Sequence, residues 1–269
     1  MKKALILTAA LCTAGVCTLK GRTGHPGLEK LRGWGYAHRG LHKEGIPENS
    51  MAAFRAALEK GYGIELDIHL MKDGNLAVIH DSSLLRTAGA DVRIEDLTEA
   101  DLENYRLEGT DERIPLFRDV MAIYEGIAPM IVELKPVDGN HAALCRAACD
   151  LLEGYQGIFC LESFDPRCVR WLKQNRPQLI RGQLTENFVK GKNNLNPAIR
   201  FVLTHNLLNF TTCPDFVAYK FADRKYSPTT ALCRHAWEIQ GVTWTIRSQE
   251  DYDTAVKEGW LPIFEGFEP

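Results

Sequence analysis

Short β-rich runs alternate with helical patterns along the chain from Leu31 onward. Repeated β-then-α units favour a parallel sheet covered by helices. The strand-like runs, eight in number, are residues 34–40, 63–68, 129–135, 157–164, 179–184, 216–220, 241–247 and 262–267. Eight units in about 240 residues predict an α/β fold, the (β/α)₈ TIM barrel. An open doubly wound sheet is the alternative, but His38-Arg39-Gly40 is not the Gly-rich phosphate loop that would favour it.

The composition is that of an ordinary globular protein. Of 269 residues, 45% are hydrophobic and 25% are charged, and the net charge is −3. These values fit one large domain or two small ones, and they give no sign of the basic stripe that a nucleic-acid partner would usually show. The cysteines after residue 22 have neither CxxC pairing nor metal-ligand spacing, so we expect buried free thiols.

The first 22 residues differ from the rest of the chain. An uncharged run from Ala4 to Leu19 lies between Lys3 and Lys20. It is long for the core of a signal peptide and short for a spanning helix of roughly 20 residues. We therefore expect a membrane anchor or signal-like segment at residues 1–22, a membrane-associated protein, and a barrel domain at residues 31–269.

Residues 185–210 fit the alternation least well, because they are too long for a simple connection between a strand and a helix. Asn196-Pro197 can begin a helix that carries several apolar side chains. An outer helix of the barrel is the plainer interpretation. A lid or a membrane-facing element is the alternative.

The segment 63–81 has the pattern of a β-hairpin that extends the second strand. If Asp73-Gly74 forms a two-residue type I′ turn, His80 lies directly opposite Asp67. One face of the hairpin is then apolar, while the other gathers Glu65, Asp67 and His80. His69 shares this polar face and is a further candidate for contact with a substrate.

Carboxylates and cations recur at the ends of other predicted strands. Glu133 and Lys135 lie on one face of the strand 129–135, and the first strand ends in His38-Arg39. In a barrel these ends meet at one rim, where active sites lie. Neighbouring carboxylates resist ionising together, and a hard divalent cation removes their repulsion. Together with two histidines near neutral pKa, the rim predicts hydrolysis of an anionic phosphodiester.

Four motifs carry a resemblance to a known family. H-R-G at 38–40, P-E-N at 47–49, E-x-D at 65–67 and H-D at 80–81 occur in the order found in the glycerophosphodiester phosphodiesterases. The chain resembles that family over roughly residues 36–265, and most closely a bacterial, membrane-anchored type, whereas 185–215 shows little similarity. The resemblance implies a (β/α)₈ barrel that hydrolyses glycerophosphodiesters to an alcohol and glycerol 3-phosphate.

The resemblance also implies roles for individual residues, beginning with one Ca²⁺ or Mg²⁺ ion as the cofactor. The roles are metal ligands at Glu65, Asp67 and Glu133, general acid and base at His38 and His80, phosphate binding at Arg39 and Lys135, support at Glu48 and Asn49, and substrate contacts at Trp244 and Glu265. Glu265 stands where the family often has the Asp of Thr-Asp-x-Pro.

Two other functions remain open at this stage. The barrel could hydrolyse intact lysophospholipids, as a lysophospholipase D does, or it could bind phosphodiesters at a membrane without turning them over. The partners we expect are a small glycerophosphodiester or lysophospholipid and, through the N-terminal segment, a membrane. The sequence predicts no oligomeric state.

Overall fold

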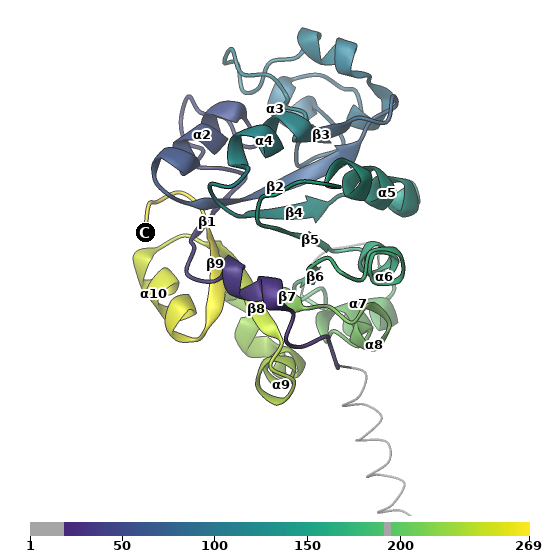
Figure 1. Ribbon diagram of the computed structural model, residues 1–269, viewed down its shortest axis with the longest axis vertical. Helices are drawn as coiled ribbons and strands as arrows, with labels where there is room; N and C mark the ends of the chain where they lie inside the picture. Colours follow the sequence, from purple (N-terminus) through teal and green to yellow (C-terminus); the bar gives the residue numbers. More distant parts are fainter. Residues whose placement is uncertain (1–18, 191–194) are drawn as a thin grey trace, which may run out of the picture.

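The computed structural model describes residues 19–190 and 195–269, and its parallel strands form a closed barrel (Figure 1). The barrel strands are β1 Tyr36–His38, β2 Gly63–Leu70, β4 Met130–Leu134, β5 Phe159–Ser163, β6 Arg181–Thr185, β7 Phe216–Lys220, β8 Gln240–Ile246 and β9 Trp260–Phe264. Neighbours pair in parallel in chain order, and β1 pairs with both β2 and β9. The prediction of a (β/α)₈ barrel is confirmed.

Helices surround this barrel (Figure 1). Those of eight or more residues are α2 Met51–Glu59, α4 Phe117–Tyr124, α5 His141–Leu151, α6 Pro166–Asn175, α7 Pro197–Thr204, α9 Pro228–Ala236 and α10 Gln249–Lys257. The shorter ones are η1 Pro26–Leu31, α3 Leu85–Ala88, η2 Ile94–Asp96, η3 Glu99–Asn104, α8 Asn209–Thr212 and η4 Phe221–Tyr226. The Ser50 side chain accepts a hydrogen bond from the Ala53 backbone N–H and caps α2.

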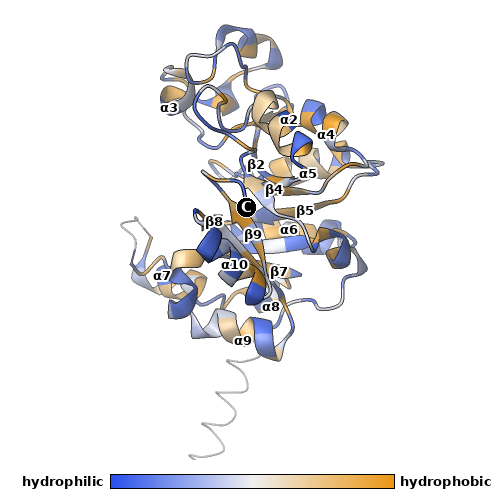
Figure 2. Cartoon of the chain, turned by 90° about the vertical axis from the view of Figure 1, so that its left-hand side faces the viewer, coloured by the Kyte–Doolittle hydropathy of each residue, from blue (hydrophilic) through white to orange (hydrophobic). Residues whose placement is uncertain are grey.

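The strands pack apolar residues on both of their faces. On β2, Ile64, Leu66 and Ile68 pack toward the helices and contribute to the main core. The opposite face of each strand points into the barrel, where a second core fills the interior. The helices show hydrophobic and hydrophilic residues on different sides, as expected when only one side meets the sheet (Figure 2). Because side chains alternate along β2, Glu65 and Asp67 face the barrel interior.

The hairpin exists, but its predicted register is wrong by one residue. Strand β3, Leu76–Val78, pairs with β2 so that Ile68 lies opposite Val78. The Ile79 backbone N–H donates to the Asp67 carbonyl oxygen, so Asp67 has Ile79 rather than His80 as its neighbour.

The cause of the shift is a three-residue turn in place of the predicted two-residue turn. The Met71 N–H donates to the Asn75 carbonyl across residues 72–74. The Asp73 carboxylate accepts a hydrogen bond from the Asn75 N–H, and Gly74 adopts a left-handed φ of +89°. A three-residue loop with glycine in the left-handed region is a common hairpin connection.

Residues 71–116 form an insertion between β2 and α4. The insertion contains β3, α3, η2 and η3, and it lies beside α2 and α4 in Figure 1. It has a small apolar core of its own, which includes Ile79, Ile94 and Leu102. This core holds the loop after β3, and therefore His80, against the barrel.

The segment after β6 provides outer helices, in agreement with the plainer interpretation. The Thr185 hydroxyl donates to the Leu203 carbonyl oxygen, and the Tyr219 hydroxyl donates to that of Thr204. These bonds fix the end of α7 against β6 and β7.

Five of the six cysteines in the described part of the chain are buried, all six are free, and Cys213 is partly exposed.

The prediction of a membrane localisation is wrong for the part of the chain that the structure describes. Across residues 19–190 and 195–269, no helix has the length and apolar character needed to cross a bilayer. Most of the predicted anchor, residues 1–18, lies outside the described residues.

Candidate active site

A cavity of about 280 Å³ opens at the carboxyl ends of the barrel strands. Most of the residues predicted to form the site line it: His38, Arg39, Glu65, His80, Glu133, Lys135 and Trp244. Residues up to about 200 positions apart in the sequence therefore meet at this rim, as their places at strand ends predict.

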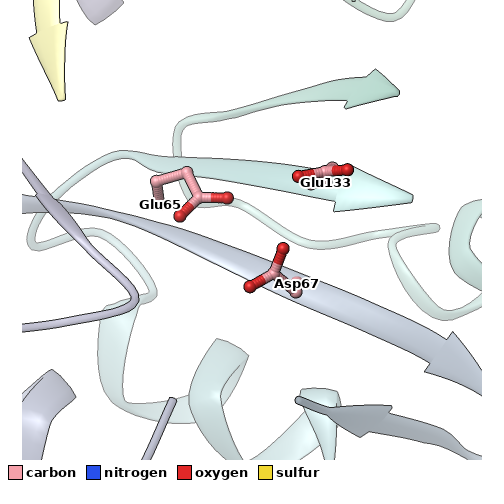
Figure 3. A group of neighbouring side chains, drawn as sticks. All are labelled: Glu65, Asp67 and Glu133. Carbon is pink, nitrogen blue, oxygen red and sulfur yellow. The ribbon is translucent and has the colours of Figure 1, made fainter. Parts of the chain in front are cut away.

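Three buried carboxylates form a cluster at this cavity (Figure 3). Glu65 and Asp67 come from β2, and Glu133 lies beside Asp67 on the neighbouring strand β4. Each residue offers one oxygen, and these oxygens all lie within 4.8 Å of one another. Carboxylate oxygens at this spacing fit a hard divalent cation such as Ca²⁺ or Mg²⁺.

The cluster resists ionisation at two of its three positions. Burial, together with the charges of Asp67 and Glu133, raises the pKa of Glu65 well above its usual value. Burial also raises the pKa of Glu133, to about 7, against the opposing effect of Lys135. At Asp67, burial is outweighed by Lys135, His80 and Arg39, so the pKa of this carboxyl is lowered. A divalent cation would stabilise the ionised form of all three groups.

Protons should therefore compete with a metal ion at this cluster. Below pH 7 Glu133 holds a proton that must leave before the cation binds, and the raised pKa of Glu65 adds to this competition, so we expect affinity for Ca²⁺ or Mg²⁺ to fall by at least about tenfold per pH unit below 7. Calorimetric titrations at pH 6 and pH 8, in buffers with different ionisation enthalpies, measure both the affinity and the released protons. Equal affinities without proton release would contradict this expectation.

Two cations hold the carboxylates in place. The Lys135 Nζ atom lies 3.1 Å from Asp67 Oδ1 and 2.9 Å from Glu133 Oε1. The Arg39 Nε atom lies 3.5 Å from Asp67 Oδ2, and Arg39 Nη1 lies 2.9 Å from Glu48 Oε1. Both cations therefore lie beside the three-carboxylate cluster, where they can also bind an anionic substrate.

The P-E-N segment, residues 47–49, supports this arrangement from the loop before α2. The Asn49 side-chain amide donates to Asp67 Oδ2 over 2.9 Å, and the Asn49 backbone N–H donates to the Arg39 carbonyl oxygen over 2.8 Å. Arg39 and Asn49 both have a positive φ, 54° and 53°, which is uncommon for residues with side chains. Such backbone persists where the surroundings fix it, as these hydrogen bonds do. Glu48 is shared between Arg39 and Arg86.

His38 has a carboxylate partner on one ring nitrogen. Its Nδ1 atom lies 2.6 Å from Glu265 Oε2, and its Nε2 atom lies 3.8 Å from Glu65 Oε2. Burial lowers the pKa of His38, and Glu265 opposes this effect in part. The hydrogen bond from His38 lowers the pKa of Glu265 to about 2, and Arg247 also contacts this carboxylate. Glu265 is predicted to contact the substrate, but in the structure its carboxylate is the partner of the His38 Nδ1 atom.

His80 has a similar arrangement. Its Nδ1 atom lies 2.7 Å from Asp81 Oδ1, and Arg86 Nε donates to the other Asp81 oxygen. Burial is the largest influence on the pKa of His80, which is lowered. A carboxylate at Nδ1 favours the tautomer with its hydrogen there, so Nε2 carries the free lone pair. Despite the changed hairpin register, His80 still lines the cavity.

His69 is not at the cavity, although it shares the hairpin face. Its side chain is buried, with Nδ1 2.7 Å from Glu95 Oε1 and Nε2 3.1 Å from the His80 carbonyl oxygen. Ser82 donates to the second oxygen of Glu95. His69 therefore ties the end of β2 to the backbone of His80.

Sequence reasoning missed three charged residues that line the cavity. They are Glu162 within β5, Lys220 at the end of β7 and Arg247 just after β8. Glu162 carried a usable signal, because a carboxylate inside a buried strand is as unusual as Glu133. The sequence singles out Asp81, in the H-D motif, and Glu265, but it does not indicate that their carboxylates are the partners of His80 and His38.

Comparison with known proteins agrees with this geometry. The chain is 33% identical over 133 residues to lysophospholipase D GDPD1 of Rattus norvegicus, covering 45% of this chain and 41% of that protein. It is 39% identical over 94 residues to a glycerophosphodiester phosphodiesterase of Caldanaerobacter subterraneus subsp. tengcongensis, covering 32% and 38%. The chain thus matches about two fifths of the length of these curated relatives.

Solved structures share the fold over nearly the whole chain. A phosphodiesterase of Oleispira antarctica, in complex with the product sn-glycerol-3-phosphate, superposes with a TM-score of 0.70 at 19% identity, covering 91% of this chain and 95% of that one. A protein from Silicibacter pomeroyi, described as a glycerophosphoryl diester phosphodiesterase, gives 0.72 at 18% identity, covering 90% and 94%. Residues 38–264, from the first motif to the end of β9, match the Glycerophosphoryl diester phosphodiesterase family, to which this chain therefore belongs.

Proposed function

We propose that the barrel domain, residues 31–269, hydrolyses glycerophosphodiesters to an alcohol and glycerol 3-phosphate. One observation supports this proposal most strongly. A single cavity brings together a three-carboxylate cluster, two cations and two histidines, each of which is hydrogen-bonded to a carboxylate. Family membership agrees with it. A phosphodiester needs charge neutralisation and two proton transfers, and these groups supply both.

Glu65, Asp67 and Glu133 would hold one divalent cation, Ca²⁺ or Mg²⁺. When bound, it acts as a Lewis acid on a phosphoryl oxygen. Arg39 and Lys135 neutralise the negative charge that grows on the phosphoryl oxygens during the reaction. These side chains are already fixed by Glu48, Asp67 and Glu133, so little reorganisation is needed when the substrate arrives.

His38 and His80 move the protons. One Nε2 atom takes the proton of the attacking oxygen, which belongs to water or to a hydroxyl of the substrate. In the second case the product is a cyclic phosphate, which water must then open to give glycerol 3-phosphate. The other histidine donates a proton to the oxygen of the leaving alcohol. Glu265 and Asp81 stabilise whichever imidazole becomes positively charged, and they hold each ring in one tautomer.

A second candidate substrate is a lysophospholipid. The outer part of the cavity is aromatic: Trp244 and Phe164 make an edge-to-face contact at 5.6 Å, and Phe188 packs on Phe164 at 6.1 Å. On the nearby α7, Ile199 and Phe201 are about half exposed. An acyl chain could lie along such a surface, and the relatives named lysophospholipase D favour this reading.

Product analysis distinguishes the two substrates. Purified protein with Mg²⁺ or Ca²⁺ is given glycerophosphocholine or lysophosphatidylcholine, and glycerol 3-phosphate or lysophosphatidic acid is measured. The proposal expects turnover of glycerophosphocholine with the higher kcat/KM. A preference for lysophosphatidylcholine would select the second candidate, and turnover of neither would contradict both.

His69→Ala tests how the His80 backbone is positioned. We expect kcat to fall about ten- to a hundredfold with little change in KM, because the His80 carbonyl loses its partner and the ring shifts from its reactive position. Steady-state kinetics with thermal unfolding measure this effect. His141→Ala on α5 is the control, and kcat of His69→Ala equal to that of the control would refute the positioning role.

A further inference from the structure

Glu162 is a buried carboxyl group that the proposed reaction leaves without a role. It lies on β5 directly beside Glu133 of β4 and is 1% exposed. It lines the cavity, yet its Oε2 atom is buried without any hydrogen-bond partner. Burying an oxygen of this kind without a donor is unfavourable, because its hydrogen bonds to water are lost and not replaced. The donor it lacks would therefore have to come from whatever occupies the cavity.

Glu162 is not part of the three-carboxylate cluster. Among the described residues, the group whose ligand atoms lie within 4.8 Å of one another consists of Glu65, Asp67 and Glu133 alone. Lys135 contacts Asp67 and Glu133. The carboxyl group of Glu162 is thus next to the cluster but outside its ligand set.

The position of Glu162 relative to the phosphate-binding cations indicates which part of a substrate it meets. Lys135 follows the end of β4, two residues beyond Glu133, and its Nζ atom turns back to 2.9 Å from Glu133 Oε1. Because Glu162 is the neighbour of Glu133 on β5, the Lys135 charge lies beside the level of Glu162, on the side toward the mouth of the barrel. A phosphate at Lys135 that points its larger substituent outward would direct its short, hydroxylated substituent toward Glu162. The outer wall is aromatic, with Phe164 and Trp244.

We propose that Glu162 forms a hydroxyl-recognition subsite, in which its carboxyl group hydrogen-bonds a glycerol hydroxyl of the substrate. This inference rests on the proposed function, because it takes the ligand to be a glycerol phosphate ester. It makes Glu162 a determinant of specificity. A site whose buried polar group needs a substrate hydroxyl discriminates strongly against an analogue without it.

Binding measurements test the subsite without turnover. The probes are glycerol 3-phosphate, 3-hydroxypropyl phosphate, which lacks the secondary hydroxyl, and propane-1,2-diol 1-phosphate, which lacks the terminal one. For the wild type, we expect at least one analogue to bind about ten- to a hundredfold more weakly than glycerol 3-phosphate. Glu162→Leu should reduce this ratio to about two or less, whereas Glu162→Gln should keep most of it, because an amide still donates and accepts hydrogen bonds.

Glu186→Gln is the matched control, because Glu186 pairs with Lys220 at the mouth and its change also removes one carboxylate. It should keep the wild-type ratio. The subsite is refuted if Glu162→Leu, folded by circular dichroism, discriminates as the wild type does. It is also refuted if Glu162→Gln weakens metal binding as much as Glu133→Gln, since Glu162 would then be a ligand. Because the ratios come from binding, absence of turnover counts against the proposed reaction and leaves this test in force.

Discussion

Replacing His80 with alanine should lower kcat for glycerophosphocholine by about 10²- to 10⁴-fold, the usual loss when a positioned acid or base is removed. The imidazole is 30% exposed at the edge of the cavity, and its Nδ1 atom pairs with Asp81, which is also partly exposed. The fold and the affinity for the metal ion should therefore survive. Stopped assays of product formation, together with thermal unfolding, measure the two effects. A folded variant with the wild-type kcat would remove His80 from the mechanism.

A substrate with a different leaving group can show which histidine is the general acid and which is the general base. A glycerophosphodiester with a 4-nitrophenol leaving group needs no protonation as it departs. The variant that lacks the general acid should therefore recover much of its rate on this substrate, while the variant that lacks the general base should not. His38→Ala and His80→Ala should respond differently. Equal recovery in both would contradict a division of labour between them.

Glu65→Gln should abolish metal-dependent turnover and weaken metal binding by at least about a hundredfold, the upper range of losses even for residues that only support metal ligands. Glu65 is preferable to Asp67 for this test. Asp67 contacts Lys135, Arg39 and Asn49, so its removal would take one carboxylate partner from each of two buried cations and destabilise the fold.

Stability provides an independent check on Glu65. Its pKa is raised in the folded state, so its contribution to stability is present at low pH and is lost as pH rises toward the folded pKa. Glutamine removes this penalty, and the metal-free Glu65→Gln variant should unfold at pH 8 at the same temperature as the wild type or a higher one. Wild-type metal affinity, or a marked loss of stability without metal, would contradict the role given to Glu65.

The sequence predicts the barrel and most of the site because both follow from local patterns. Strand period two places Glu65 and Asp67 on one face, and parallel strands bring Glu133 to the same rim. The hairpin register was predicted wrongly because turn length depends on how Asp73 bonds to Asn75 and on the left-handed Gly74. One additional residue in the turn changes the partner of every residue in the two paired strands.

The remaining differences arise from contacts between distant parts of the chain. Glu265 is 227 positions from His38, and no motif links the two residues. Asp81 does belong to the H-D motif, but its role as the partner of His80 depends on the loop that the insertion holds in place. The membrane localisation was inferred from hydropathy alone, and the described helices do not support it.

Chelation tests the central claim, which is metal-dependent hydrolysis at the carboxylate cluster, most directly. Glycerol 3-phosphate formed from glycerophosphocholine is measured before treatment with a chelator, after it, and after Ca²⁺ or Mg²⁺ is returned in excess. Loss of turnover on chelation and its recovery with one of the two ions is the predicted result. Turnover that continues at its original rate in the chelator would contradict the claim.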